Sequence, residues 1–329
     1  MTVLRYLGLA RETTYDMPTP PAAAFHVDIA SSSLDAPSET QLIYEGGLSR
    51  GPRMHRPGFY SPSGNMVYAF DIRTIAMLLH WTLGGYRFTT GTPLHTHEIW
   101  ASNSNTLPSF TARCGKDIFE HVFSGCVINS LEIAIEGEFC MATADIVAAR
   151  DSRAALQPLS SLLLPTEHPM AFHEVTASLR GTDRSADIKS LTLSINNNLD
   201  AEAGRSIGSR HPRRIPAQGL EVSMSADLWY SSTAELEHYW GGASGPAASG
   251  ATTLPVALTF NAGAQGEMVV ELPRFLYTEV QQQPSGREAI TQSISGQALE
   301  ASETLVGGTP IVSTPIVATV TNGQSNLTS

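Results

Sequence analysis

Lysine, cysteine and charge are all scarce in this chain of 329 residues. Only Lys116 and Lys189 are lysine, and charged side chains make up 16% of the sequence. Proteins that bind nucleic acid tightly neutralise phosphates with clustered lysine and arginine, so the net charge of −11 argues against that class. The three cysteines, Cys114, Cys126 and Cys140, are too few and odd in number for a disulfide framework. We therefore expect a chain that folds in a reducing cytosol and does not bind DNA tightly.

Long apolar runs and catalytic motifs are missing as well. No stretch reaches the roughly 18 apolar residues that a membrane-spanning helix needs, and the N-terminus lacks the layout of a signal peptide. The sequence contains no Gly-x-Ser-x-Gly elbow and no glycine-rich phosphate loop. We expect no enzymatic activity, no cofactor and no membrane contact. The length suits two domains of about 150 residues each.

Alternation of apolar and polar residues is the strongest local pattern. Residues 188–195 read IKSLTLSI and residues 127–136 read VINSLEIAIE. Period-two alternation predicts strands of a sheet with one buried face and one hydrated face. Further strands are predicted at 65–70, 109–113, 141–148, 221–228, 256–260, 268–272, 290–299 and 316–321. The fold class is therefore mainly β.

Two short segments depart from that pattern and predict helices. Residues 72–83 have apolar side chains at helical spacing, and residues 232–240 begin with Ser232 and Glu235 in capping-box register. Each segment is followed by two glycines, which favour a helix C-terminus. The sequence thus predicts one short helix in each half of the chain.

The two halves share an order of features that predicts an internal duplication. FHVDIASSSLDA from Phe25 aligns with SLTLSINNNLDA from Ser190, and SRGPR from Ser49 aligns with SRHPR from Ser209. A strand, a helix, two glycines and a strand pair follow in both halves. We predict an N-terminal arm at 1–24, a first copy at 25–150, a connector at 151–187, a second copy at 188–322 and a C-terminal tail at 323–329.

Several of these segments resemble the tail tube proteins of long-tailed bacterial and archaeal viruses, of the larger two-domain kind. The resemblance rests on Gly-Cys-x-x-Asn-Ser-Leu from Gly125, on the asparagine run at 196–198 and on ELPRFLYTE from Glu271. It implies two tandem β-sandwich or barrel domains, each with one flanking helix. One sheet of every domain would join an inter-subunit β-barrel that lines a tube.

The resemblance also implies how such a chain assembles. It implies a structural virion protein, assembled in the host cytoplasm, whose stacked rings conduct viral DNA without binding it specifically. A duplicated chain would close the ring as a trimer with pseudo-hexameric symmetry, and a ring of six chains is the alternative. The tape measure, tail terminator and distal tail proteins would be its other partners.

The hydrated strand faces supply candidate lumen residues, and two loops supply candidate contacts between rings. The lumen candidates are Ser130, Glu132, Glu136, Thr192, Ser194 and Asn196. The same side chains would face outer solvent if the sheet were turned the other way. The loops at 46–64 and 204–219 concentrate the basic residues, and both fit either inter-ring contacts or ordinary solvated loops. Their candidate contact residues are Arg50, Arg53, Arg56, Arg205, Arg210, Arg213 and Arg214.

Two other classes of protein remain open. A cupin-like metal-dependent enzyme would use His95 and His97, which share a strand face, but Glu98 points to the opposite face and the glycine frame of a cupin is missing. Another ring-forming component of a tail or secretion tube would share the fold.

Overall fold

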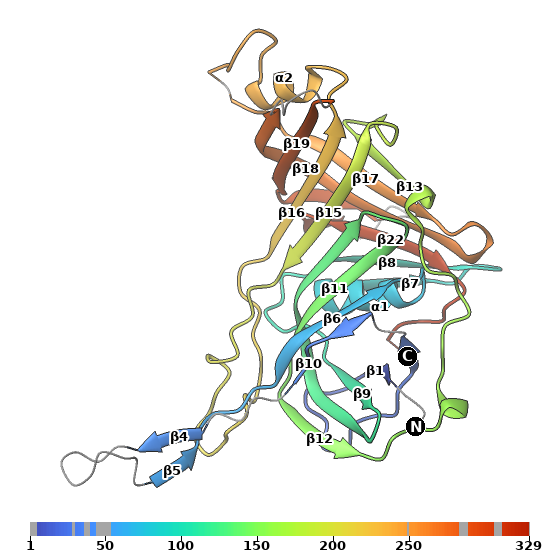
Figure 1. The fold of residues 1–329 in the computed structure, drawn as a ribbon. Coiled ribbons are helices and arrows are strands. Elements are labelled where there is room, and N and C mark those ends of the chain that lie inside the picture. The colour runs from blue at the N-terminus through green and yellow to red at the C-terminus, as the bar shows by residue number, and fades with distance from the viewer. Residues whose placement is uncertain are drawn as a thin grey trace.

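The computed structural model describes residues 5–27, 30–35, 40–43, 54–248, 250–282, 289–305 and 311–328. Antiparallel strands dominate these residues, and two α-helices accompany them (Figure 1). The predicted mainly β fold class is confirmed. Three single-turn 3-10 helices lie at Leu159–Ser161 (η1), Phe172–Glu174 (η2) and Gly263–Gln265 (η3).

One long antiparallel sheet, here called the eight-stranded sheet, runs through both halves of the chain. Its strands follow the order β3–β6–β11–β10–β15–β16–β19–β18. From the first half come β3 (Ser31–Ser32), β6 (Ser63–Ala69), β11 (Cys140–Val147) and β10 (Phe119–Ile135). From the second half come β15 (Ile188–Asn196), β16 (Glu221–Trp229), β19 (Thr291–Ala298) and β18 (Gly266–Gln282). The halves meet where β10 pairs with β15 from Ser130↔Asn196 to Ile135↔Leu191.

The 17-residue strands β10 and β18 each belong to two sheets. The C-terminal part of each lies in the eight-stranded sheet, and the N-terminal part lies in an outer sheet. The first outer sheet has the order β12–β10–β9–β1–β2, with β12 at Arg150–Ala154, β9 at Phe110–Lys116, β1 at Arg5–Arg11 and β2 at Phe25–Val27. Residues 5–11 of the predicted N-terminal arm thus form a strand of this sheet.

The second outer sheet has the order β14–β13–β17–β18–β22–β8–β7. Its strands besides β18 are β14 (Thr182–Asp183), β13 (Val175–Leu179), β17 (Leu254–Asn261), β22 (Val317–Asn322), β8 (His95–Ala101) and β7 (Gly84–Thr89). Because β7 and β8 follow the first helix, the first half contributes a hairpin to the outer sheet of the second half. Two separate hairpins, β4 (Thr40–Ile43) with β5 (Met54–Pro57) and β20 (Ala301–Thr304) with β21 (Ile311–Thr314), complete the strands.

The same strand pairings occur in both halves. In the first, β9 pairs with β10, β10 with β11, and β11 with β6; in the second, β17 pairs with β18, β18 with β19, and β19 with β16. The registers correspond too, because Phe110 faces Cys126 as Leu254 faces Phe275.

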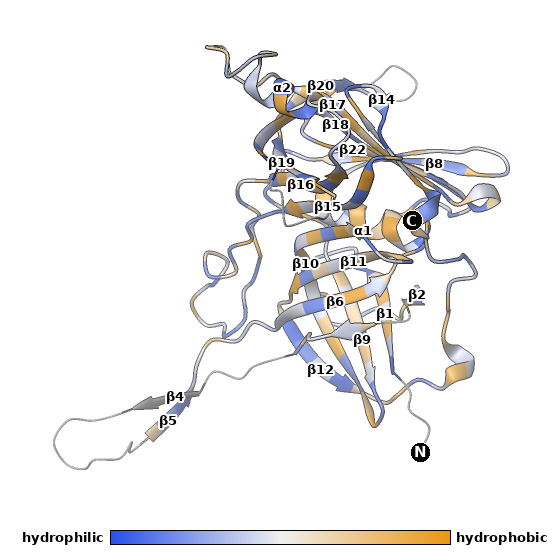
Figure 2. Cartoon of the chain, turned by 45° about the horizontal axis from the view of Figure 1, so that its top comes forward, coloured by the Kyte–Doolittle hydropathy of each residue, from blue (hydrophilic) through white to orange (hydrophobic). Residues whose placement is uncertain are grey.

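The apolar core lies between the eight-stranded sheet and the outer sheets, as the hydropathy colouring of Figure 2 illustrates. Alternation positions it, since Leu191, Leu193 and Ile195 of β15 are buried while the residues between them are partly exposed. The aromatic rings of Trp81 and Phe110 stack at 4.5 Å between centroids in the first half. Burying such side chains supplies most of the favourable free energy of folding.

The two helices occupy corresponding places but differ in burial. Helix α1 (Thr74–Leu83) follows β6, and every one of its residues is buried. The carboxylate of Asp71 accepts hydrogen bonds from the backbone amides of Arg73 and Thr74, both at 2.8 Å, which satisfies free donors of the first turn. Helix α2 (Ala234–Trp240) follows β16 and ends at Gly241, whose φ of 69° is left-handed. Of its residues, Glu235 alone is buried.

The chain after β22 folds back onto β7 and β1 of the first half. Leu327 is buried, and its amide donates a hydrogen bond to the Tyr86 hydroxyl at 3.0 Å. The Arg11 guanidinium donates to the backbone carbonyl of Thr328. Residues 323–328 of the predicted tail are therefore docked on the first half.

Candidate lumen surface

Polar side chains cover the exposed face of the eight-stranded sheet in continuous rows. Successive strands place Asp145, Ser130, Asn196 and Glu221 opposite one another. The next row holds Thr143, Glu132, Ser194, Ser223 and Gln297. A third row holds Ala134, Thr192, Ser225 and Ser295. The face is therefore shared by both halves and is built from small polar and acidic residues.

Five of the six predicted lumen residues lie directly in these rows. Ser130, Thr192, Ser194 and Asn196 are partly exposed, and Glu132 is exposed. Glu136 follows β10 and borders a hollow of about 310 Å³ on the same face, together with Asp227 and Glu279. The structure thus brings all six onto one side of one sheet.

Acidic groups lie on several strands of the face, and none of the residues in the three rows is basic. The carboxylates are those of Glu132, Glu136, Asp145, Glu221, Asp227 and Glu279. Where the rows continue into β11 and β6 they reach the apolar Met141, Val67 and Ala69. At the end of β16 the Lys189 ammonium lies 4.5 Å from the centre of the Trp229 ring. Asp227 accepts a hydrogen bond from the Ser293 hydroxyl of the neighbouring strand. Such a surface repels a polyanion by its charge while its hydroxyl and amide groups hold water.

Sequence reasoning missed half of this face. Glu221, Ser223, Ser225 and Asp227 belong to β16, whose sequence EVSMSADLW alternates as clearly as that of β15. That alternation was a usable signal. The position of Asp145 on this face could not be predicted from its sequence ATAD, because small alanines do not indicate which side of the strand is buried.

Asparagine side chains join the two halves at the end of this face. The Asn197 amide donates to the carbonyls of Thr82 and Ile128, both at 3.0 Å. The Asn129 amide donates to Asp145 at 2.9 Å, and its oxygen accepts from the Leu199 amide at 2.9 Å. The asparagine run and the Asn-Ser motif noted in the sequence thus hold β10 against the start of the second loop.

The predicted basic loops contact each other within one chain. The Arg205 guanidinium lies 4.0 Å from the centre of the Phe59 ring, and Arg210 donates to the Gly58 carbonyl at 2.9 Å. Two of the predicted contact arginines thus have partners inside the chain. Arg56, Arg213 and Arg214 are exposed, while Arg50 and Arg53 lie outside the described residues.

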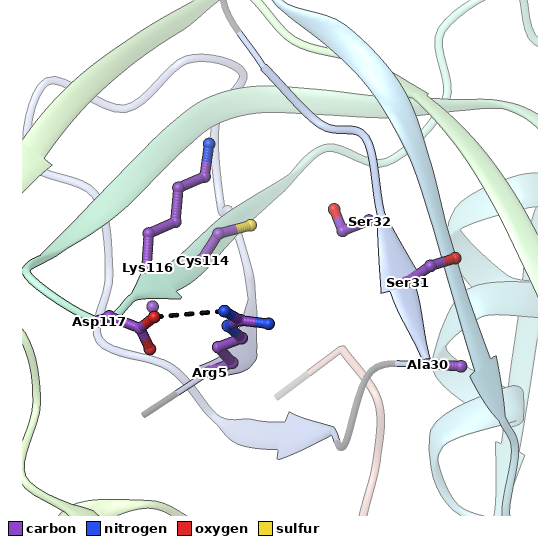
Figure 3. Close-up of a pocket in the computed structure, with 8 residues that line it drawn as sticks. Arg5, Ala30, Ser31, Ser32, Cys114, Lys116 and Asp117 are labelled. Atoms are coloured by element: carbon purple, nitrogen blue, oxygen red, sulfur yellow. Dashed lines mark hydrogen bonds and ion pairs between the residues drawn. The ribbon is translucent and has the colours of Figure 1, made fainter. Parts of the chain in front are cut away.

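A separate hollow of about 390 Å³ lies between β3 and the β9–β10 turn (Figure 3). At its rim the Arg5 guanidinium forms an ion pair with the Asp117 carboxylate at 3.4 Å. The Lys116 ammonium lies 3.8 Å from the Asp35 carboxylate. Cys114 also lines the hollow, and burial raises the pKa of its thiol to about 12, so it stays protonated at neutral pH.

The two histidines singled out as a metal pair have other roles. His97 is buried, with Nδ1 2.9 Å from the Tyr86 hydroxyl and Nε2 3.0 Å from the Asn322 side-chain oxygen. Nδ1 of His95 accepts a hydrogen bond from the Gly91 amide at 3.2 Å. Within the described part of the chain, no three His, Cys, Asp or Glu side chains are grouped to hold a metal ion.

Comparison with protein families identifies the family of this chain. Residues 2–298 match the family model described as phage tail tube protein. The chain belongs to the phage tail tube protein family. This assigns it a structural role in the virion tail, as the resemblance implied. A search of curated proteins gave no match.

Family membership agrees with the architecture around the polar face. The described helices α1 and α2 are too short to cross a membrane. A mainly β chain with one long sheet fits a structural protein of the phage tail tube.

Proposed function

We propose that this tail tube family member assembles into closed rings that stack into a tube and conduct phage DNA through the lumen. The continuous acidic and polar face of the eight-stranded sheet carries this proposal. DNA can slide along such a wall, because repulsion and retained water prevent it from binding specifically. The acidic composition of the whole chain supports the same reading.

Among the residues that the structure describes, the eight-stranded sheet has two edges without a neighbouring strand, and these edges suggest how a ring would close. Strand β3 lies at one edge, and the C-terminal part of β18, from Leu276 to Gln282, lies at the other. Exposed edges invite pairing, and closure into a barrel removes them. Within the chain, β10 joins β15 by the same kind of contact. We infer that β18 of one chain pairs with β3 of the next.

Chain duplication sets the expected number of subunits. The repeated pairings support two tail-tube domains per chain, with boundaries near 25–150 and 188–322 and a connector between them. Three chains would then form a pseudo-hexameric ring, and six chains remain the alternative. Rings would stack through Arg56, Arg213 and Arg214, and the tape measure, terminator and distal tail proteins would bind the finished tube.

Electron microscopy of the purified chain, with light-scattering mass, tests this proposal. We expect rings or hollow tubes, with a ring mass of three chains. A Thr278→Pro variant places proline at the exposed bulge residue of β18, which has no partner in the β19 register, and should remain folded and monomeric. A matched Ile118→Ser variant in the β9–β10 turn should assemble like the unmodified chain. A chain that stays monomeric at high concentration, both alone and with tail initiation proteins, would contradict the proposal.

A further inference from the structure

The unequal burial of the two helices indicates that something is missing around α2. All ten residues of α1 are buried, whereas Leu236, Tyr239 and Trp240 of α2 remain partly exposed. Both helices stand at the same place in their halves, after β6 and β16. The surroundings of the two helices differ: α1 packs against β10, β7 and β8, whereas α2 packs against β18.

One segment beside α1 is the chain that leaves the outer sheet of the second half. After β22, residues 323–328 turn toward the first half and bury Leu327. The Leu327 amide binds the hydroxyl of Tyr86, whose ring lies 4.8 Å from that of His80 in α1. Residues 323–328 thus add to the cover that β7 and β8 give α1.

The counterpart of this covering segment follows β12. Strand β12 pairs with the N-terminal part of β10, where Glu120 faces Ala154, and β22 pairs with the N-terminal part of β18, where Val269 faces Thr319. The number of residues from Ala154 to Leu162 equals the number from Thr319 to Leu327. Residues 159–164, LSSLLL, here called the leucine strap, therefore correspond to the segment that covers α1.

The leucine strap leaves its apolar side chains in solvent. Leu159, Leu163 and Leu164 are 63%, 55% and 52% exposed, and residues 155–166 carry no charge. The backbone of the strap is nevertheless held, because Leu163 donates to Nδ1 of His26 at 2.9 Å and accepts from the His26 amide at 2.8 Å. A fixed cluster of exposed leucines marks a contact surface.

Within one chain the strap and α2 are far apart. Helix α2 stands at one end of the molecule, and the connector that contains the strap lies at the other end, near the N-terminus (Figure 1). The strap flanks β2 on the side of the β3 edge, and α2 packs beside β18. These are the two sides that meet when one chain follows another around a ring.

We propose that the leucine strap of one chain packs against α2 of the neighbouring chain, as residues 323–328 pack against α1 within a chain. This contact rests on the proposed ring. Leu162 to Leu164 would cover the half-buried Leu236, Tyr239 and Trp240. Because the strap is uncharged, the contact is apolar and depends little on salt.

A Leu163→Ser/Leu164→Ser double variant tests the contact without disturbing the core, since both side chains are exposed. Its circular dichroism and melting temperature should match those of the unmodified chain. The concentration needed for ring assembly should rise at least ten-fold. The Ile118→Ser control, which also removes an exposed apolar side chain, should leave that concentration unchanged.

Cross-linking then locates the partner surface. Chains carrying Leu163→Cys are mixed with chains carrying Trp240→Cys, assembled and oxidised. We expect a disulfide-linked pair of chains in rings, and none when Ile118→Cys replaces Leu163→Cys. Rings that form normally with the double serine variant and give no Leu163→Cys cross-link would overturn the strap contact while leaving the tube function intact. A chain that forms no rings at all would overturn the tube function and the contact together.

Discussion

The side-chain amide of Asn197 lies 3.0 Å from the backbone oxygen of Thr82 and bridges the second half of the chain to the end of helix α1. Its second amide hydrogen reaches the Ile128 carbonyl in β10. Asn197 is buried, so its amide needs these carbonyls as hydrogen-bond acceptors. The joint between the halves therefore has a buried polar contact at its end, whereas only the core-facing side of the β10–β15 pairing is apolar.

Replacing Asn197 by alanine should destabilise the whole chain. The variant leaves two carbonyls without this donor, and we expect a loss of about 2 kcal/mol in the free energy of unfolding. Urea denaturation followed by tryptophan fluorescence measures it. Asn103→Ala, at an exposed loop position, is the matched control and should differ little from the unmodified chain. Equal stability of the two variants would contradict the bridging role.

Protonation of His80 should make stability depend on pH. Burial and, to a smaller extent, the Arg11 charge lower the pKa of His80 from 6.5 to about 4. Between pH 6.5 and pH 4 the unfolded chain binds a proton that the folded chain does not, so stability falls with falling pH by up to about 1.4 kcal/mol per pH unit. His80→Leu should remove this part of the slope. His55→Leu, at an exposed position, should keep it.

Replacing carboxylates on the exposed face of the eight-stranded sheet by lysine should produce tubes that bind DNA. Glu132→Lys/Asp227→Lys should still assemble, because both side chains are exposed, and the tubes should retain DNA in a salt-dependent manner. Co-sedimentation of tubes with short DNA measures this. Glu267→Lys changes an exposed residue of the outer sheet, and its tubes should behave like the unmodified ones. Equal DNA retention by both variants would place the face elsewhere than in the lumen.

Arginine reversal in the second loop should separate stacking from ring closure. Arg213 and Arg214 are exposed, so Arg213→Glu/Arg214→Glu should fold and form rings. We expect few or short tubes, and a weaker salt dependence of tube growth. Arg205→Ala, which loses the contact with Phe59 inside the chain, serves as the comparison. Tubes of normal length from the double variant would exclude these two arginines from the stacking contact.

The three thiols should be unreactive in the folded chain. All three cysteines are buried, and burial raises the pKa of Cys114 and of Cys140 to about 12. A chromogenic disulfide reagent at pH 8 should label no thiol in native protein and three in urea. Rapid labelling of folded protein would contradict this burial.

The sequence predicted every strand of the eight-stranded sheet except β3, at least in part. In the outer sheets it predicted β9, β17 and β22 but missed β1, β2, β7, β12 and β13. Residues 188–195 were predicted as a strand, and β15 spans Ile188–Asn196. Strand β10, by contrast, begins at Phe119, eight residues before the predicted start, because FEHVFSGC is buried on both faces and shows no alternation. One-sided burial leaves a pattern in the sequence, and two-sided burial does not.

Long-range contacts were beyond the reach of local patterns. Sequence alignment matched Phe25 with Ser190, whereas the registers against Val67 and Asp227 make Ser31 the counterpart of Ser190. The shared Leu-Asp-Ala triplet drew the alignment away from the strand register. The contact of Arg205 with Phe59 was equally hidden, since it depends on how the two loops fold against each other.

The continuity of β10 and β18 has a mechanical consequence. A peptide backbone does not stretch, and each of these strands runs without a break from the eight-stranded sheet into an outer sheet. Widening the inner wall would therefore shear the hydrogen bonds of the outer layer as well. A force that deforms the eight-stranded sheet is therefore shared by the outer sheets, so a tube built from such chains would resist both widening and narrowing.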